Sequence, residues 1–199
     1  MPERLDPAAF IRDEVAPRHR RRIADLRTQI ARLDRELEDR LAADATVELV
    51  LEGDGGGTWY VTIRGEDVAV ADRPPAPPVV RVRQTRGDWE ALARLGLGGV
   101  GGNPAGGELT RSRVDRLRTV RGTLELRLAG DDAERRVTVQ FGEPGGDPPP
   151  PRCTVAMRQA DALRMQKGEL TPQGAFMQGI VRLEGDVGFA MQLGAVLFL

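Results

Sequence analysis

The residues that could carry chemistry in this chain of 199 residues are few and scattered. Cys153 and His19 are its only cysteine and its only histidine. A single thiol excludes an internal disulfide and a zinc site built from several cysteines. His19 lies in the charged run 18–22, where a histidine-based catalytic triad is not expected. We therefore expect no metal and no cofactor, and a buried, inert thiol at Cys153, which begins an apolar strand pattern.

Two other patterns with chemical potential have simpler interpretations. Asp131 and Asp132, like the acids at positions 36, 38 and 39, lie in turn or helix-surface patterns without apolar neighbours to desolvate them, as catalytic carboxylates require. Residues 96–101 match G-x-G-x-x-G, but a helix pattern precedes them and more glycine follows. A dinucleotide site needs a strand before this motif and a helix directly after it. We interpret the segment as a linker and predict that the chain is not an enzyme.

Arginine supplies nearly all of the positive charge, since Lys167 is the only lysine, and the formal net charge is −1. Arginines at 111, 113, 116, 118 and 121 could contact phosphates. Near-neutral total charge and the lack of interleaved aromatics favour a solvated helix face, so nucleic acid is not an expected partner. The functional alternative is transient docking on an anionic membrane surface. Without a signal-peptide core or a membrane-length apolar run, a cytoplasmic protein is expected.

The elements that must position these residues begin with an amphipathic helix over residues 17–43. Its apolar residues recur every three or four positions at Ile23, Leu26, Ile30, Leu33, Leu37 and Leu41. Packing of this face on the chain's own sheet is the favoured interpretation. The same spacing fits a short coiled-coil seam, through which two copies of the chain would form a homodimer.

An ordered series of elements then occurs twice. A hairpin is predicted over 46–52 and 58–63, followed by a proline cluster, a strand at 79–82 and a short helix at 88–95. Strands at 123–131 and 136–139, a second proline cluster, a strand at 153–157 and a helix at 161–165 repeat this order. The repetition predicts an internal duplication whose first copy is truncated by the glycine-rich segment 96–107. A helix over 108–120 follows that segment.

The C-terminal segment 168–198 carries the most specific pattern. Thr171 and Pro172 begin a helical turn that Gly179 ends, a strand follows from Ile180, and a helix is expected over 187–193 before a final strand over 195–198. Pattern alone favours an ordinary apolar core here over a ligand cavity.

Several ordered blocks of residues 114–199 resemble the sterol carrier protein type 2 domain family. They are Cys153-Thr154-Val155-Ala156-Met157, Gly168-Glu169-Leu170-Thr171-Pro172, Ala175-Phe176-Met177-Gln178-Gly179 and Leu183-Glu184-Gly185-Asp186. Residues 46–95 resemble the first half of the same domain. The resemblance implies an α+β fold, with a mixed sheet covered on one face by helices. It also implies non-covalent binding of an apolar lipid, such as a fatty acyl chain, acyl-CoA or sterol, in a tunnel lined by Met165, Phe176, Met177, Ile180, Phe189, Met191 and Leu193.

These considerations predict three parts and one principal function. The parts are an N-terminal helical segment (1–44), a truncated sterol-carrier-like repeat with its linker (45–110) and a complete lipid-binding domain (111–199). The predicted function is non-catalytic binding or carriage of a lipid. The alternatives are an interaction scaffold that keeps the fold without a cavity, and an accessory domain of a lipid-metabolising enzyme. The truncated copy could frame the tunnel mouth or obstruct it.

Overall fold

A computed structural model of the protein describes residues 6–97, 109–142 and 147–198. The chain divides into two compact units, Met1–Asp39 and Arg40–Leu199. The predicted boundaries after residues 44 and 110 stay predictions. Most of the expected linker, residues 98–107, and with it the last four residues of the G-x-G-x-x-G match, lie outside the described residues.

Helical structure in the first unit starts at Pro7 and continues into the second unit. It comprises α1 (Pro7–Phe10), a π-helical turn, η1 (Ile11–Val15), and α2 (Ala16–Leu41). Asp6 caps the start, because its side chain accepts a hydrogen bond from the Ala8 amide at 3.1 Å and Pro7 occupies the first turn. The helix predicted over 17–43 is thus confirmed, and helical structure begins ten residues earlier.

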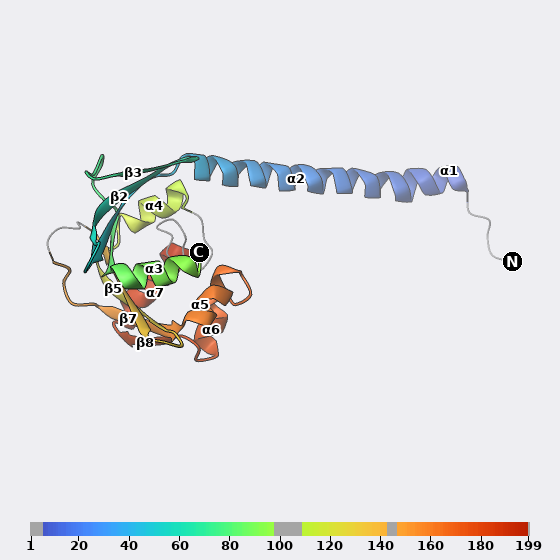
Figure 1. Ribbon diagram of the computed structural model, residues 1–199. Helices are drawn as coiled ribbons and strands as arrows, with labels where there is room; N and C mark the ends of the chain where they lie inside the picture. The colour runs from blue at the N-terminus through green and yellow to red at the C-terminus, as the bar shows by residue number, and fades with distance from the viewer. Residues whose placement is uncertain (1–5, 98–108, 143–146, 199) are drawn as a thin grey trace. The chain divides into compact units, whose positions relative to one another are not determined.

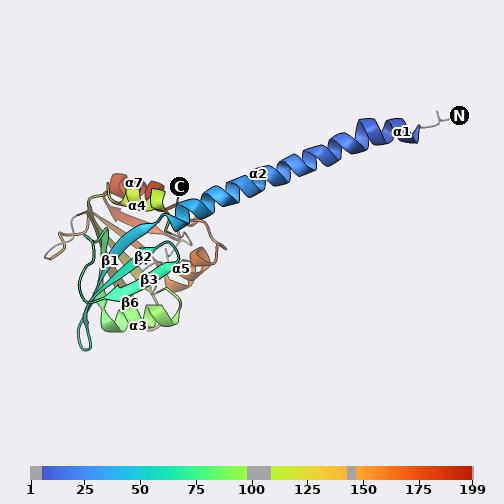
Figure 2. The ribbon, with the colours of Figure 1, turned by 90° about the horizontal axis from the view of Figure 1, so that it is seen from above.

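The second unit is built on one mixed sheet of eight strands (Figure 1). The strands are β1 (Asp44–Glu52), β2 (Gly57–Arg64), β3 (Asp67–Ala71), β4 (Val80–Thr85), β5 (Gly122–Ala129), β6 (Glu134–Phe141), β7 (Cys153–Arg158) and β8 (Arg182–Gly185). Their order across the sheet is β3-β2-β1-β4-β6-β5-β7-β8. In Figure 2, β1, β2 and β3 are seen side by side.

Two halves of the sheet share one strand arrangement. β1 pairs antiparallel with β2 and parallel with β4, and β5 pairs in the same way with β6 and β7. A helix begins directly after the third strand of each half: α3 (Arg86–Arg94) follows β4, and α5 (Gln159–Gln166) follows β7. The two halves meet where β4 pairs antiparallel with β6. A duplication would produce this arrangement, and the duplication itself stays a prediction.

The remaining helices are α4 (Arg111–Leu117), α6 (Pro172–Met177) and α7 (Val187–Phe198). Alternate strand residues such as Leu124, Phe141 and Cys153 point toward these helices and form the main core with Phe189 and Leu193 of α7. A second cluster joins Leu92 of α3 and Ala162 of α5 to β5 and β6. The expected α+β fold with helices on one face of the sheet is confirmed.

The opposite face of the sheet is polar but partly buried. Glu48 of β1 and Arg81 of β4 stand side by side in the register and form an ion pair with Nε–Oε2 and Nη2–Oε1 distances of 2.8 and 2.9 Å. Their side chains are only 8% and 10% exposed. Thr46 and Thr62 share a hydrogen bond of 3.3 Å across β1 and β2. The sheet therefore has one polar face and one apolar face that forms the core.

Two local predictions differ from the structure. The last residues, 195–198, form the end of α7 rather than a strand. Val196 follows Phe189 by seven positions and Leu193 by three, so helical spacing buries all three, and a short apolar run does not reveal this by itself. The five-residue strand β3 was not predicted because all its residues are exposed, with no buried face to detect.

Candidate functional site

The C-terminal signature positions α7 through a close contact with the segment before β7. The Asp186 amide donates to the Arg152 carbonyl at 2.7 Å, and Asp186 Oδ1 accepts from the Phe189 amide at 2.9 Å, which caps α7. A Cβ at Gly185, whose φ is +93°, would lie 2.4 Å from the Arg152 carbonyl oxygen. The Leu-Glu-Gly-Asp block therefore combines a glycine that permits close approach with a helix cap.

The Arg152 side chain completes this junction. Its Nη2 lies 2.5 Å from Asp186 Oδ2, and its guanidinium lies 4.6 Å from the centroid of the Phe189 ring. The Phe189 amide, first, and then the Arg152 guanidinium hold the pKa of the Asp186 carboxyl below its ordinary value. The sequence reasoning missed Arg152. The sequence feature that could have identified it is the position of this arginine directly before the Cys153 strand, opposite the Gly185-Asp186 turn.

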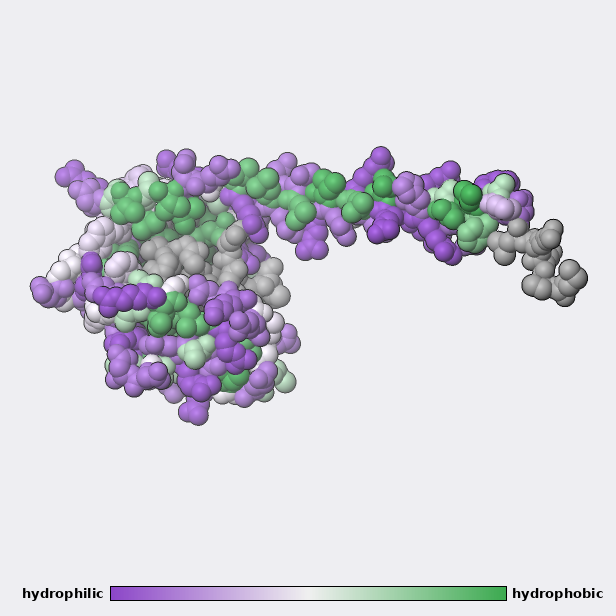
Figure 3. Space-filling view, turned by 45° about the vertical axis from the view of Figure 1, so that its right-hand side comes forward, coloured by the Kyte–Doolittle hydropathy of each residue, from purple (hydrophilic) through white to green (hydrophobic). Residues whose placement is uncertain are grey.

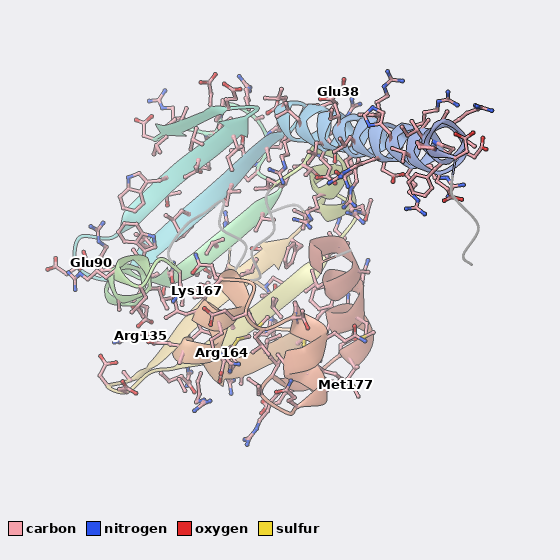
Figure 4. All side chains as sticks on the ribbon, turned by 90° about the vertical axis from the view of Figure 1, so that its right-hand side faces the viewer. Glu38, Glu90, Arg135, Arg164, Lys167 and Met177 are labelled. Carbon is pink, nitrogen blue, oxygen red and sulfur yellow. The ribbon has the colours of Figure 1, made fainter. Side chains whose placement is uncertain are left out.

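The residues predicted to line a tunnel lie in three different environments. Phe189 and Leu193 are buried in the main core. Met165 is buried in a third cluster with Leu170 and Ala175, and the half-buried Ile180 packs against it. The other three predicted residues are exposed: Phe176 by 50%, Met177 by 77% and Met191 by 65%. Figure 4 shows Met177 directed outward from α6. The assignment of these seven residues as a ligand site stays a prediction.

Helix α6, which covers the third cluster, is short, starts at a Thr-Pro pair and is followed by a glycine. Thr171 caps it by accepting a hydrogen bond from the Gly174 amide at 3.1 Å, and Pro172 occupies its first turn. Gly179 follows with φ +68°, in the left-handed region that glycine adopts readily. The Thr-Pro start and the glycine end predicted for this turn are both present.

A cavity of about 420 Å³ lies at the ends of β5 and β7, beside the connection from α6 to β8. Its apolar wall includes Ala156, Met157 and Ile180. Met157 and Ile180 also pack against the third cluster, so the cavity borders the small core under α6. A volume of this order is in the range of small-molecule sites.

Half of the residues that line the cavity are charged: Arg127, Arg158, Arg182, Glu134 and Asp161. Asp161 is buried and accepts from Arg158 Nε at 2.9 Å. The pKa of Arg127 is raised, chiefly by its hydrogen bond to Glu125. Among the described residues, no ion pair engages the exposed Arg182. Alternation along β5 and β7 could have revealed these residues, since positions two apart share a face.

The candidate chemical groups of the sequence behave as structural residues. Cys153 is buried, as expected, and burial first and Asp186 second raise its thiol pKa. That change disfavours the reactive thiolate. Within residues 6–97, 109–142 and 147–198, no cluster of three or more potential metal ligands is found, and no helix there is long and apolar enough to cross a membrane.

A family model described as the SCP-2 sterol transfer family matches residues 108–198. This match covers α4 to α7 and with them the Arg152–Asp186 junction and the cavity. The match supports an SCP2 domain in residues 108–198. The SCP2 domain therefore includes the half of the sheet formed by β5 to β8, whereas β1 to β4 precede it.

Rat and human sterol carrier protein 2 are each 42% identical to the chain over 41 residues. That segment is 21% of this chain and 8% of either relative, so the chain matches only a small part of their length. A crystal structure of sterol carrier protein 2 like 2 from Aedes aegypti is 24% identical, covering 56% of this chain and 97% of the other, with a TM-score of 0.34. A solution structure of palmitated SCP2L2 from the same mosquito is 23% identical, covering 58% of this chain and 96% of the other, with a TM-score of 0.35.

Proposed function

We propose that the SCP2 domain binds an apolar lipid without catalysing a reaction on it. The observation that carries the proposal is the 420 Å³ cavity within the family-matched segment, which shares Met157 and Ile180 with the cluster under α6. An acyl chain or sterol body extending from the cavity into this cluster would contact Met165 and Ile180. A cytoplasmic location and a carrier role would fit this activity.

The charged side of the cavity suits a lipid that has an anionic group. Arg182 is exposed and lies opposite Ala156 in the β7–β8 register, so its cation is available beside the apolar wall. A carboxylate or phosphate would gain charge-assisted hydrogen bonds there. The proposal therefore favours fatty acids and acyl-CoA over neutral sterols.

The remaining predicted lining residues would contact the ligand at different depths. Phe176 and Met177 lie on the exposed side of α6, where a ligand would enter, and Met191 offers apolar surface on α7. Phe189 and Leu193 would be reached by a ligand that extends into the main core. Gly179, which follows α6, supplies backbone freedom at that end of the helix.

Titration with a fluorescent fatty acid tests the proposal, with native mass spectrometry of the purified protein as a second measurement. The variant Ile180→Trp fills the apolar side of the cavity and should weaken binding at least tenfold. Val187→Trp is the matched control, because Val187 is 53% exposed on α7 and does not line the cavity. Equal affinity in the two variants, or no binding by the unaltered protein, would refute the proposal.

The role of Arg182 is tested by comparing a fatty acid with its methyl ester. Arg182→Ala should weaken binding of the acid several-fold and leave the ester unchanged, because only the acid carries the charge that the guanidinium would meet. If both ligands lose affinity equally, the arginine does not recognise the headgroup.

A further inference from the structure

The helix α2 presents a narrow apolar stripe that no described residue of its own unit covers. Ile30, Leu33 and Leu37 are 58%, 62% and 53% exposed, and Ile23 and Leu26 continue the row (Figure 3). Their spacing of 3-4-3-4 residues assigns Ile23, Ile30 and Leu37 to position a of a heptad and Leu26 and Leu33 to position d.

The heptad positions e and g, which flank the stripe, distinguish packing on the chain's own domain from a coiled coil. A helix that packs on the core of its own domain has apolar residues at a, d and also e or g, whereas a strict a/d stripe is the seam of a coiled coil. Here the e positions between Ala16 and Leu37 are Arg20, Arg27 and Asp34, and the g positions are Arg22, Gln29 and Glu36. Every flanking position in this stretch is polar, so the pattern favours packing against a partner helix.

The charge distribution along α2 indicates which helix is the partner and whether it runs parallel or antiparallel to α2. Residues 18–27 contain five arginines against one acid, Asp25, whereas residues 28–39 contain two arginines against four acids. Parallel alignment of two copies would bring both basic halves together and set Arg22 near Arg27 of the second copy. Antiparallel alignment instead brings residues 22–27, with Arg22 and Arg27, beside the acid-rich residues 36–39 of the second copy.

We propose that two copies of this chain associate through an antiparallel coiled coil of their α2 helices, centred between Ile30 and Leu33. This alignment packs Leu26 against Leu37 of the second copy, and the symmetry repeats the contact. It also brings Arg27 near Asp34 of the second copy, twice. Neither residue has an ion pair among the described residues of its own chain, so both are available for this contact. The inference does not depend on lipid binding.

Sedimentation velocity on the full chain at micromolar concentration tests the association. We expect a dimer of twice the 21.7 kDa chain mass. Leu33→Asp places a charge in the seam and should shift the protein to monomer. Ala31→Asp is the matched control, because Ala31 lies away from the seam on the same helix and receives the same charge. A monomeric unaltered protein, or equal effects of the two variants, would overturn the proposal.

Disulfide trapping tests the direction. Leu26→Cys and Leu37→Cys are prepared separately and oxidised alone or mixed, and Cys153 does not compete because it is buried. Antiparallel alignment predicts a cross-linked heterodimer in the mixture and little cross-linking in either variant alone. Cross-linking of each variant with itself would show a parallel pair and would overturn the proposed direction. The unfolding temperature of the second unit, measured in all variants, should stay unchanged.

Discussion

The guanidinium of Arg152 lies 4.6 Å from the centre of the Phe189 ring while one of its nitrogens pairs with Asp186 at 2.5 Å. This contact joins the start of β7 to the start of α7. Gly122 makes room for it: a Cβ there would lie 2.7 Å from Arg152 Cδ and 3.2 Å from Phe189 Cζ. Residues from three separate segments therefore converge where α7 docks on the sheet, and the first three predictions test this junction.

Ionisation of Asp186 should stabilise the fold in a defined pH range. Its pKa is lowered in the folded protein by the Phe189 amide and Arg152, relative to an unfolded value of about 3.9. A lowered folded pKa means that the stabilisation is present above pH ~4 and disappears as the pH falls through the folded pKa. The unfolding temperatures of the unaltered protein and Asp186→Asn should differ above that pH and converge in acid. A difference that grows in acid would contradict this assignment.

Phe189 should contribute far more to stability than Met191, two positions along α7. Phe189 is 2% exposed and meets Phe141 edge-to-face with ring centroids 6.5 Å apart. Phe189→Ala should therefore lower the free energy of unfolding by about 3–5 kcal/mol. Met191→Ala, at a side chain 65% exposed, should change it by less than ~0.5 kcal/mol. Urea denaturation measures both, and similar losses would mean that α7 is rotated from the orientation described.

The contrast within α7 also shows which parts of the molecule were predictable. The resemblance of the C-terminal blocks to a known family predicted the α+β fold. The Thr171-Pro172 helix start, the Gly179 helix end and the Gly185-Asp186 turn were predictable from the sequence itself, because proline and glycine have local effects on the backbone. The environments of Phe176, Met177 and Met191 were not predictable, since side chains of one apolar type serve equally as core, cavity lining or surface. The charged cavity wall was missed because it depends on the pairing of β5 with β7, far apart in sequence.

Gly185 should tolerate no side chain, whereas Gly194 should benefit from one. Gly185→Ala combines a φ of +93° with a Cβ 2.4 Å from the Arg152 carbonyl oxygen. The backbone conformation alone should cost about 1–3 kcal/mol, and the contact adds to this. Gly194 lies inside α7, and apart from its chain neighbours and the nearby backbone of its own helix, no atom lies within 4 Å of the position that a Cβ would occupy there. Gly194→Ala should therefore stabilise the protein by up to ~1 kcal/mol. Thermal unfolding of both variants checks the prediction, and equal destabilisation would contradict it.

The buried pair Glu48–Arg81 should be costly to break and inexpensive to remove as a whole. Because both side chains are about nine-tenths buried, Glu48→Ala removes the carboxylate of a buried ion pair and should cost about 3–5 kcal/mol. The double replacement Glu48→Leu with Arg81→Met removes both charges and should cost much less than the single change.

Glu134→Ala is the control on the same face of the sheet. Glu134 pairs with Arg136 at 2.9 Å, but both side chains are exposed, so the loss of this pair should cost less than about 1 kcal/mol. Chemical denaturation of the four proteins measures these differences. If the double variant is as unstable as Glu48→Ala, the cost arises from lost packing of the side chains rather than from breaking the ion pair.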